Sequence, residues 1–249
     1  MRLLTWNING LDPTCLDERT EGAVFTTIAG TTLDRIANGA KPWTPPDVVC
    51  FQEVTAHTLH AHVHPHLRAV GYTVLPEFAP ERQTFEVVAV RAPYTVGAHM
   101  ERPLVDSIFG RVLHSVDVAG PLGAIRVATA HFDSGPESGL TRQAQLRQVI
   151  AVIGSRGVFG GDANFRNKEW LAVKADAGVV DAWEAVGEPT ATRFTWFMDT
   201  IKARFDRVWV GPALRATSMA PVGEKDIPEI RARASDHIGL LVSLADRTT

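Results

Sequence analysis

The sequence predicts an α+β fold, a four-layer αββα sandwich in which two mixed, mostly antiparallel β-sheets pack face to face between outer helices. Short apolar segments rich in β-branched residues recur along the chain and predict eight strands, against only four helices. This excess of strands is typical of packed antiparallel sheets rather than of a doubly wound parallel sheet. The 249 residues contain no internal repeat, low-complexity tract or linker, so we expect one domain over residues 1–249.

The predicted elements follow in chain order. Apolar segments of strand length lie at Leu3–Ile8, Val48–Glu53, Phe85–Val90, Arg111–Val118, Ala124–Ala130, Val158–Gly160, Ala203–Val210 and Gly239–Leu244. Longer segments predict helices over Leu16–Ala37, Ala56–Val70, Leu140–Ile153 and Lys168–Asp176. Gly39 and Gly71 follow the first two helices, where a glycine commonly ends a helix. Gly120-Pro121-Leu122-Gly123 joins two strands and indicates an antiparallel hairpin.

Composition and charge exclude several classes of protein. Hydrophobic residues make up 45% and charged residues 21% of the chain, which excludes wholesale disorder. The net charge of −3 argues against a protein that coats duplex DNA, so a nucleic-acid role needs a local basic patch or a chain end. With no apolar stretch of membrane length, no signal-like N-terminus, and only Cys15 and Cys50, we expect a cytoplasmic protein without a membrane partner. Nothing indicates an oligomer interface, so we expect a monomer.

Polar residues gather at the ends of predicted strands. Five strands or their immediate neighbours carry an acid, an amide or a histidine at one end: Asn7, Glu53, His131, Asp162 with Asn164, and Asp236 with His237. Buried segments do not tolerate carboxylates unless these are paired or bind metal. We therefore expect these strand ends to meet at one rim of the sandwich, where loops on a rigid scaffold form a site.

The residue types at these strand ends suit phosphoester hydrolysis. Glu53, Asp162 and Asp236 offer hard oxygen ligands, which favour Mg²⁺ or Mn²⁺ over zinc. The other members can hold water or phosphate oxygens by hydrogen bonds: Asn7, His131, Asn164 and His237. A cation that neutralises phosphoryl oxygens, a carboxylate that prepares water, and donors that fix the geometry are what this hydrolysis requires.

Four sequence blocks resemble the endonuclease/exonuclease/phosphatase superfamily, which has the DNase I-like fold. They are Thr5-Trp6-Asn7, Gln52-Glu53, Gly161-Asp162-Ala163-Asn164 and Ser235-Asp236-His237. They occur in the order of that family and cover nearly the whole chain. The resemblance implies a metal-dependent phosphodiesterase or nuclease.

A second set of blocks resembles one branch of that family, the tyrosyl-DNA phosphodiesterases of type 2. The blocks are Thr5–Asp12, His131–Ser134, Asn164–Arg166, Asp181–Glu184, Phe194–Trp196 and Arg204–Arg207. Enzymes of this branch cleave the bond between a protein tyrosine and a DNA 5′-phosphate and leave a 5′-phosphate. The resemblance implies Mg²⁺ as cofactor, with Mn²⁺ as a substitute. Its implied partners are single-stranded or frayed DNA 5′ ends that carry a protein or tyrosyl adduct.

The resemblance also assigns roles around the metal and the attacking water. Glu53 is implied as the principal Mg²⁺ ligand, and Asp236 as support for the metal or for the neighbouring histidine. Asp162 is implied to orient and deprotonate water, assisted by Asn164.

Further roles concern the phosphate and the DNA. Asn7 and His237 are implied to contact the scissile phosphate, with His131 and Ser134 beside it. Asp206 is implied to lie behind His237 and to hold it as an imidazolium. Three residues are implied to meet the DNA end or its phosphate: Arg166, Trp196 and, by a looser match, Arg111.

The sequence departs from this branch at a few positions, which leaves other functions open. Asn9 replaces an acid, and Glu86 stands where a small residue or tyrosine is usual. The alternatives are an abasic-site endonuclease or exonuclease, another phosphoesterase of this fold, or a non-catalytic nucleic-acid-binding module. No accessory segment is expected before the catalytic domain.

Five of the nine histidines lie in one short segment: His57, His60, His62, His64 and His66. The 60/64 and 62/66 pairs have the spacing of helical metal ligands. Pro65 is expected to interrupt the helix, so this segment is interpreted as a solvated surface.

Overall fold

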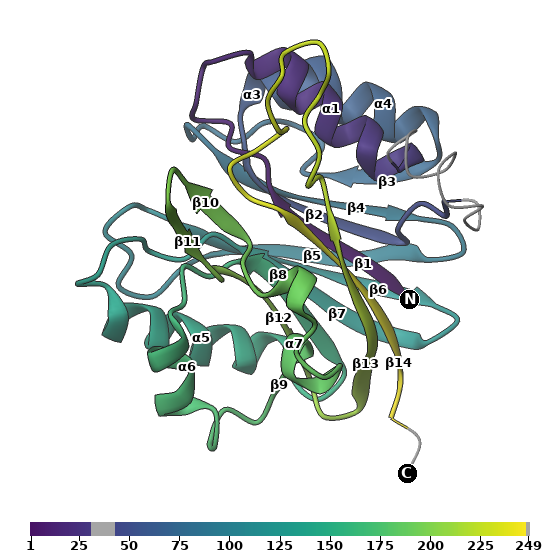
Figure 1. The fold of residues 1–249 in the computed structure, drawn as a ribbon. Coiled ribbons are helices and arrows are strands. Elements are labelled where there is room, and N and C mark those ends of the chain that lie inside the picture. Colours follow the sequence, from purple (N-terminus) through teal and green to yellow (C-terminus); the bar gives the residue numbers. More distant parts are fainter. Residues whose placement is uncertain (31–42, 248–249) are drawn as a thin grey trace.

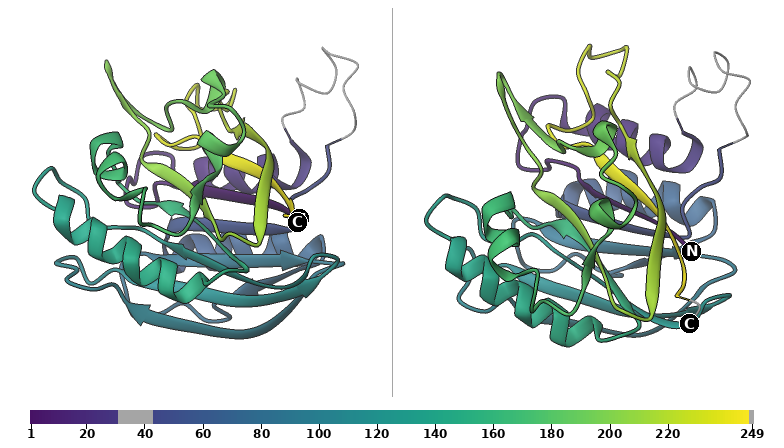
Figure 2. Two further views of the ribbon diagram at one scale, coloured as in Figure 1. Left: turned by 90° about the horizontal axis from the view of Figure 1, so that it is seen from below. Right: turned by 60° about the horizontal axis from the view of Figure 1, so that its bottom comes forward.

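Two six-stranded sheets pack face to face, with helices on both outer sides, in the computed structural model, which describes residues 1–30 and 43–247 (Figure 1). Figure 2 shows from two further directions that helices α1 (Leu16–Ala29) and α5 (Gly139–Ile153) lie on opposite sides of the sheets. The predicted αββα sandwich is therefore confirmed.

The first sheet has the strand order β13-β14-β1-β2-β4-β3 and the second the order β5-β6-β7-β8-β12-β9. In chain order the strands of the first sheet are β1 (Arg2–Asn7), β2 (Val48–Val54), β3 (Tyr72–Leu75), β4 (Phe85–Arg91), β13 (Leu214–Val222) and β14 (Gly239–Asp246). Those of the second are β5 (Thr95–Pro103), β6 (Val112–Gly120), β7 (Gly123–Ala130), β8 (Gly157–Asp162), β9 (Val180–Asp181) and β12 (Asp206–Val210). Strands β10 (Trp196–Met198) and β11 (Ile201–Ala203) form a separate hairpin. Both sheets are mixed: β1 pairs parallel with β2 and β7 pairs parallel with β8, whereas the other pairs are antiparallel.

The apolar residues form three layers of core because successive strand residues face opposite sides of a sheet. On β1, Leu3 packs between the two sheets, whereas Leu4 and Trp6 pack outward against the helices. On β8, Val158 faces the inter-sheet core and Phe159 packs beneath α5. This alternation decides which polar residues at the strand ends face the space between the sheets.

The helices cover the outer faces. The remaining helical elements are α3 (Ala56–Thr58), the π-helix η1 (Leu59–Val63), α4 (His64–Ala69), α6 (Asn167–Val173), α7 (Ala182–Ala185) and the 3₁₀-helix η2 (Thr190–Thr192). Residues 31–37 of the first predicted helix, and Gly39, lie outside the described residues. Within the part of the chain that is described, no helix combines the length and the apolar character needed to cross a bilayer.

The helix predicted over Ala56–Val70 is present, but the expectation that Pro65 interrupts it is wrong. The chain passes from α3 through η1 into α4, and Pro65 lies in the first turn of α4. A proline is tolerated in a first turn because the backbone N–H that it lacks is not needed there. The five-residue turn of η1 comes directly before it.

The strand predicted over Ala203–Val210 is confirmed over Asp206–Val210, which is β12, but its predicted start is wrong. Strand β11 ends at Ala203 and β12 begins at Asp206, and they belong to different sheets. Between them, the backbone N–H groups of Phe205 and Asp206 both donate to Oγ1 of Thr195, at 3.1 Å each. These two bonds hold the chain where it changes sheets.

Several strands were not predicted. β5 and β13 are edge strands whose residues are mostly exposed or half-buried, so they lack the apolar pattern of a buried strand. The other three, β3, β9 and β10, are too short to show a pattern. The hairpin predicted through residues 120–123 is confirmed, with Gly120 opposite Gly123.

Glu86 on β4 is buried, and its environment makes stability depend on pH. Burial, partly offset by the charge of Arg82, raises the pKa of Glu86 to about 7. A raised carboxyl pKa means that the folded state favours the protonated form, so stability falls as pH rises from about 4.5 through about 7. We expect Glu86→Gln to raise the free energy of unfolding by about 2–3 kcal/mol near pH 8 and by under about 1 kcal/mol near pH 5, in denaturant titrations. An equal gain at both pH values would contradict this account.

Candidate active site

The polar strand ends meet at one rim of the sandwich, as predicted. Asn7 ends β1, Glu53 lies near the end of β2, and Asp162 ends β8. Asp206, at the start of the antiparallel β12, lies directly opposite Asp162, and His131 forms a parallel bridge with Asp162. Backbone pairing thus brings together residues that are far apart in the sequence.

Alternation along the strands turns these side chains into the space between the sheets. Val158 on β8 and Val208 on β12 belong to the inter-sheet core. Asp162 lies four residues after Val158 and Asp206 two residues before Val208, so each carboxylate shares the face of its valine. Asn7 likewise shares the face of Leu3. All three polar residues are almost fully buried.

Glu53 reaches the same space by a different route. By simple alternation it would share the outward face of Phe51, which packs against the helices. However, the pairing of β2 with β4 shifts register between Phe51 and Val54, and Glu53 adopts a left-handed φ of 56°. Such a bulge redirects a side chain. Gly10 packs directly on this bulge, because a Cβ at Gly10 would lie 2.0 Å from the Glu53 carbonyl oxygen.

Asn7 links the two central carboxylates. Its Nδ2 donates to Oε1 of Glu53 and to Oδ2 of Asp162, both at 3.0 Å. His131 spans the same pair, with Nδ1 3.4 Å from Glu53 Oε1 and Nε2 3.2 Å from Asp162 Oδ2. The backbone N–H of Asn164 donates to the other oxygen of Asp162 at 3.0 Å. Three of the predicted residues, Asn7, His131 and Asn164, therefore contact Asp162.

His237 and Asp206 form a buried pair beside this cluster. Nδ1 of His237 lies 2.8 Å from Asp206 Oδ2, and Nε2 lies 3.6 Å from Asp162 Oδ2. The Ser235 hydroxyl donates to the carbonyl oxygen of Asn7 and accepts from the backbone N–H of His237, which fixes the loop against β1.

Burial and charge set the protonation of the two histidines in opposite directions. Burial lowers the pKa of His131 to about 3, so its imidazole is neutral at physiological pH. Burial alone would also lower the pKa of His237, but the carboxylates of Asp206 and Asp162 outweigh it and raise the pKa to about 10. His237 is therefore a cation, and its proton can be donated to a phosphate oxygen.

The carboxylates of the site fit a divalent cation. Burial raises the pKa of Glu53, and the charge of Asp162 raises it further despite the hydrogen bond from Asn7. Burial also opposes ionisation of Asp162, yet the neighbouring histidines and the hydrogen bonds from Asn7 and Asn164 hold its pKa below the usual value. The buried carboxylates of Asp162 and Asp206 and the half-buried carboxylate of Glu53 lie around one imidazolium, which leaves negative charge that a cation would balance.

Two groups of ligand atoms in this region have the spacing that a metal ion requires. The atoms of each group lie within 4.8 Å of one another, and the groups are Glu53, His131 and Asp162, and Asp162, Asp206 and His237. Asp236 faces another way, because its Oδ2 accepts from the Trp196 indole N–H at 2.9 Å. The predicted metal role of Asp236 therefore stays a prediction.

Two of the residues predicted to meet the DNA contact the same aromatic ring. Trp196 packs on Phe205 with ring centroids 5.2 Å apart, and the guanidinium of Arg166 lies over the same Phe205 ring at 5.9 Å. Arg111 is close enough for its charge to act on Glu53 and His131. Ser134 follows the His131 segment, and its carbonyl oxygen accepts from Ser138.

Several residues that support the site were not predicted individually. Gln52 is fully buried and donates to Thr129 Oγ1 at 2.9 Å and to Thr5 Oγ1 at 3.1 Å, which ties the two sheets together beneath the cluster. Asp133 accepts from Ser107, Ile108 and Gln145 and anchors the loop before β6. Thr195 caps the start of β12. Each of these residues lies in a sequence block that resembles the family, and this position was the one sign in the sequence that it supports the site.

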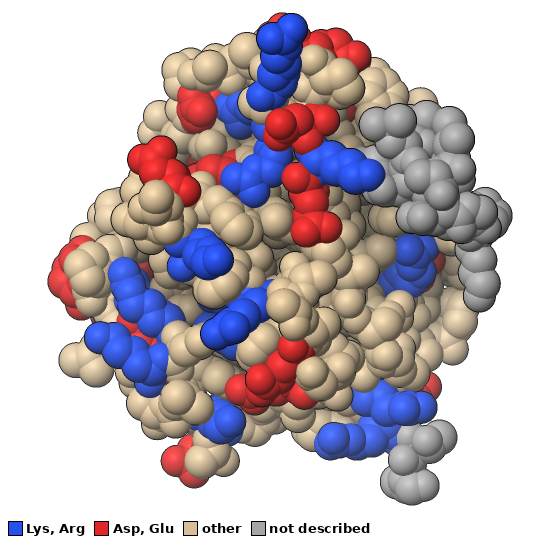
Figure 3. Space-filling view, in the orientation of Figure 1, with Lys and Arg blue, Asp and Glu red and all other residues tan. Residues whose placement is uncertain are grey.

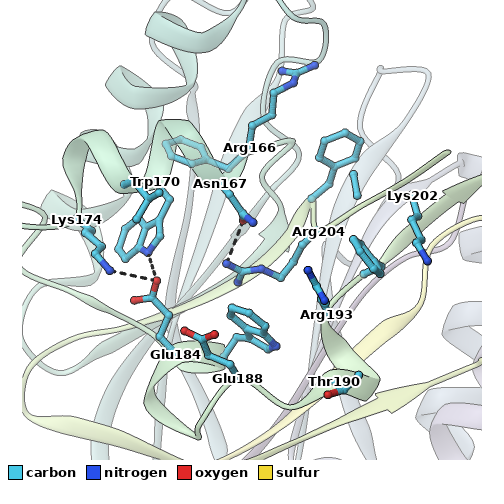
Figure 4. Close-up of a pocket in the computed structure, with 16 residues that line it drawn as sticks. Arg166, Asn167, Trp170, Lys174, Glu184, Glu188, Thr190, Arg193, Lys202 and Arg204 are labelled. Carbon is cyan, nitrogen blue, oxygen red and sulfur yellow. Dashed lines mark hydrogen bonds and ion pairs between the residues drawn. The ribbon is translucent and has the colours of Figure 1, made fainter.

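A cleft of about 710 Å³ opens beside Arg166 and Phe205 (Figure 4). Its lining combines cationic and aromatic side chains: Arg166, Lys174, Arg193, Lys202 and Arg204, with Phe165, Trp170, Trp183, Phe194 and Phe205. Some charges are paired, since Lys174 contacts Glu184 at 3.6 Å and Arg204 contacts Asp181 at 2.8 Å. Figure 3 shows Lys and Arg side chains gathered on this face around the position of β10 and β11. The overall charge is negative, but this cleft is locally basic.

Two curated proteins are similar to this chain along most of its length. The tyrosyl-DNA phosphodiesterase 2 of Gallus gallus is 28% identical over 275 residues, which covers 96% of this chain and 65% of the relative. The 5′-tyrosyl-DNA phosphodiesterase of Caenorhabditis elegans is 28% identical over 257 residues, which covers 94% of this chain and 64% of the relative. The chain thus spans slightly less than two thirds of the length of these relatives.

Among solved structures, humanized D. rerio TDP2 with 14 mutations is 24% identical in sequence, with a TM-score of 0.81 over 98% of both chains. This likeness establishes the fold. The model of the Endonuclease/Exonuclease/phosphatase family matches residues 4–237, from β1 to the site histidine. The match encloses every predicted site residue, and the chain therefore belongs to the Endonuclease/Exonuclease/phosphatase family, a family of hydrolases that act on phosphoester bonds.

Proposed function

We propose that this chain is a divalent-metal-dependent phosphodiesterase that hydrolyses the bond between a tyrosine of a protein adduct and the 5′-phosphate of DNA, leaving a 5′-phosphate. The observation that carries the proposal is the buried cluster in which Asn7 and His131 each contact both Glu53 and Asp162, with the cationic His237 beside it. The names of the relatives from Gallus gallus and Caenorhabditis elegans support the tyrosyl-DNA substrate.

Glu53 would hold the metal ion, with the cluster around His131 and Asp162 supplying further donor atoms. We propose Mg²⁺, with Mn²⁺ as a substitute, because carboxylate oxygens dominate the donor set. When bound, the ion would neutralise charge on the phosphoryl oxygens.

Asp162 is suited to accept a proton from the attacking water. Its depressed pKa keeps the carboxylate ionised, and the bonds from Asn7 and the Asn164 backbone fix its orientation. His237 is suited to donate Nε2–H to a phosphate oxygen, because Asp206 occupies Nδ1. The leaving tyrosinate has a parent pKa of about 10, so its departure needs less protonation than that of a sugar alkoxide.

The basic and aromatic cleft is suited to a single-stranded or frayed DNA end. Flat side chains stack on any base, and cations track phosphates, so such a surface binds without sequence preference. Trp196 and Arg166, which both contact the Phe205 ring, would present the terminal nucleotide to the cluster.

An assay of paired substrates tests the proposed function. We expect the purified chain with Mg²⁺ to release tyrosine from a 5′-phosphotyrosyl oligonucleotide and to leave an abasic duplex of the same sequence intact. Cleavage of the abasic duplex with no tyrosine release would indicate an abasic-site endonuclease. No turnover of either substrate would favour a binding module.

The cleft gives a prediction for affinity. Arg193 and Lys202 lie over the Phe194 ring at 5.3 and 4.6 Å, so both charges line the cleft without lying in the cluster. We expect the double substitution Arg193→Ala, Lys202→Ala to raise KM for a phosphotyrosyl oligonucleotide about tenfold while kcat changes by less than about twofold. The salt dependence of KM should also weaken.

A small substrate and a distant arginine are the controls for this prediction. A mononucleotide aryl ester has no further backbone phosphates for Arg193 and Lys202 to attract, so its KM should not change in the double variant. Arg215→Ala on β13 removes a cation that bonds the Asp246 carbonyl oxygen and should leave both substrates unaffected. A lower kcat with unchanged KM in the double variant would contradict a role in binding.

A further inference from the structure

The histidine-rich segment lies against the first helix, outside the first sheet. α1 packs beside α3, η1 and α4, and these helices cover the outward face of the sheet with Ala23, Val24, Leu59 and Val63 (Figure 1). The catalytic cluster lies instead at the rim between the two sheets. The proposed phosphodiesterase activity does not use this segment.

Two histidines of the segment converge on one carboxylate of α1. Nε2 of His57 lies 2.6 Å from Oδ1 of Asp17, and Nε2 of His62 lies 2.8 Å from the same oxygen. The side chains of His57 and Asp17 are 60% and 57% exposed, whereas that of His62 is 14% exposed. Their ligand atoms all lie within 4.8 Å of one another. The group is thus open to solvent on one side and anchored on the other.

The π-helix explains how residues five apart share one face. In an α-helix, His57 and His62 would be separated by about 140° around the axis, because each residue advances by about 100°. In η1 the backbone N–H of His64 donates to the carbonyl oxygen of Leu59, five residues earlier, so the turn is wider. π-Helical turns are uncommon and occur often at functional sites. Here the turn brings both imidazoles to the side of α1.

We propose that Asp17, His57 and His62 form a binding site for a Zn²⁺ ion that links α1 to η1. Two imidazole nitrogens and one carboxylate oxygen are a zinc donor set, and three protein ligands leave a fourth position for water. Mg²⁺ prefers oxygen ligands, so this site differs in chemistry from the carboxylate-rich catalytic cluster.

Zinc fits the three ligand atoms after a small outward movement. Zinc–ligand distances of about 2.0–2.1 Å in a tetrahedron separate the ligand atoms by about 3.3 Å. The atoms of His57 and His62 must therefore move from Asp17 Oδ1 by about half an ångström or slightly more. Two of the three side chains are more than half exposed and free to make this adjustment.

A neighbouring group, Glu21, His62 and His66, shares His62 and is the competing location. His66 packs on the Phe25 ring at 5.0 Å and stacks on His62 at 6.3 Å. The Asp17 group is favoured because two of its nitrogens already contact a common oxygen. Single substitutions separate the two locations.

Zinc binding to the full chain, measured by equilibrium dialysis in excess Mg²⁺, tests this site. We expect His57→Gln and Asp17→Asn each to remove one equivalent of bound zinc, or to weaken its binding by at least about tenfold. His66→Gln should retain that equivalent, as should His60→Gln, which changes an exposed histidine of the same segment. The difference should persist in a Glu53→Ala background, because the catalytic cluster is not involved.

Thermal unfolding provides a second readout. Zinc should raise the melting temperature of the parent by several degrees but leave that of His57→Gln unchanged, since a ligand that binds only the folded state stabilises it. Turnover with Mg²⁺ should be the same in both proteins. The proposal fails if His57→Gln binds as much zinc as the parent, or if His66→Gln loses the ion and His57→Gln keeps it. The zinc-binding and melting results do not depend on the proposed DNA substrate.

Discussion

We expect Asp162→Asn to lower kcat on a phosphotyrosyl oligonucleotide by about a thousandfold or more and to leave the protein folded. Asp162 is the residue on which the site converges: Asn7, His131, His237 and the Asn164 backbone all lie around its two oxygens. Asparagine has nearly the same shape, so it preserves packing but cannot accept the proton of the attacking water. Initial rates at saturating substrate measure this loss.

Stability and a matched substitution separate chemistry from folding in this experiment. The depressed pKa of Asp162 means that its carboxylate stabilises the folded state at neutral pH, so Asp162→Asn should lower the free energy of unfolding somewhat yet still unfold in one cooperative transition. Asp117→Asn makes the same chemical change on β6, where Asp117 pairs with Arg126 at 2.7 Å on the surface. It should leave kcat unchanged. Parent-like turnover by Asp162→Asn in a nuclease-free preparation would contradict the assigned role.

The sequence was sufficient to predict the layers and the clustering of the polar strand ends, because side chains alternate between the two faces of a strand. Leu3 and Val158 face the inter-sheet core, and the same alternation carries Asn7 and Asp162 into the space between the sheets. The strand-end motifs also occur in the order of the family, which led to the prediction that these strand ends meet. The prediction of the layers and that of the meeting strand ends both rest on the alternation of residues within single strands, which does not depend on contacts with distant segments.

Other features depend on contacts between distant segments and could not be predicted. Glu53 enters the site only through a register shift against β4 and a left-handed backbone, supported by the close approach of Gly10. Periodicity alone would have placed Glu53 on the outer face. Similarly, the division of Ala203–Val210 depends on the hydroxyl of Thr195, which a strand pattern does not show.

The histidine segment shows a related limit. Proline is a reliable signal against the interior of an α-helix, so Pro65 argued for a break. The structure instead widens the preceding turn to a π-helix and begins α4 at the proline. Of the two suggestive helical spacings, 62/66 recurs in the group with Glu21. The 57/62 pair contacts one oxygen of Asp17, although its spacing has no significance in an α-helical pattern.

The second large expected effect on kcat comes from removing the carboxylate that keeps His237 charged. We expect Asp206→Asn to lower kcat at neutral pH by about a hundredfold or more, since Asp206 Oδ2 contacts Nδ1 of His237 at 2.8 Å within a buried pair. Burial alone would lower the pKa of His237, and the carboxylates of Asp206 and Asp162 raise it to about 10. Without Asp206, burial is opposed mainly by Asp162, so we expect this pKa to fall and the imidazole to lose its proton near neutral pH.

The pH profile distinguishes this account from a loss of structure. A raised histidine pKa keeps His237 protonated below about pH 10 in the parent, whereas Asp206→Asn should be protonated only in acid. The activity of the variant should therefore increase as the pH is lowered from neutral, where the parent shows no such gain. Asp181→Asn removes another buried acid, which pairs with Arg204 and Arg207, and should reduce stability without changing the profile. An Asp206→Asn profile parallel to that of the parent would mean that Asp206 supports the fold and not the charge of His237.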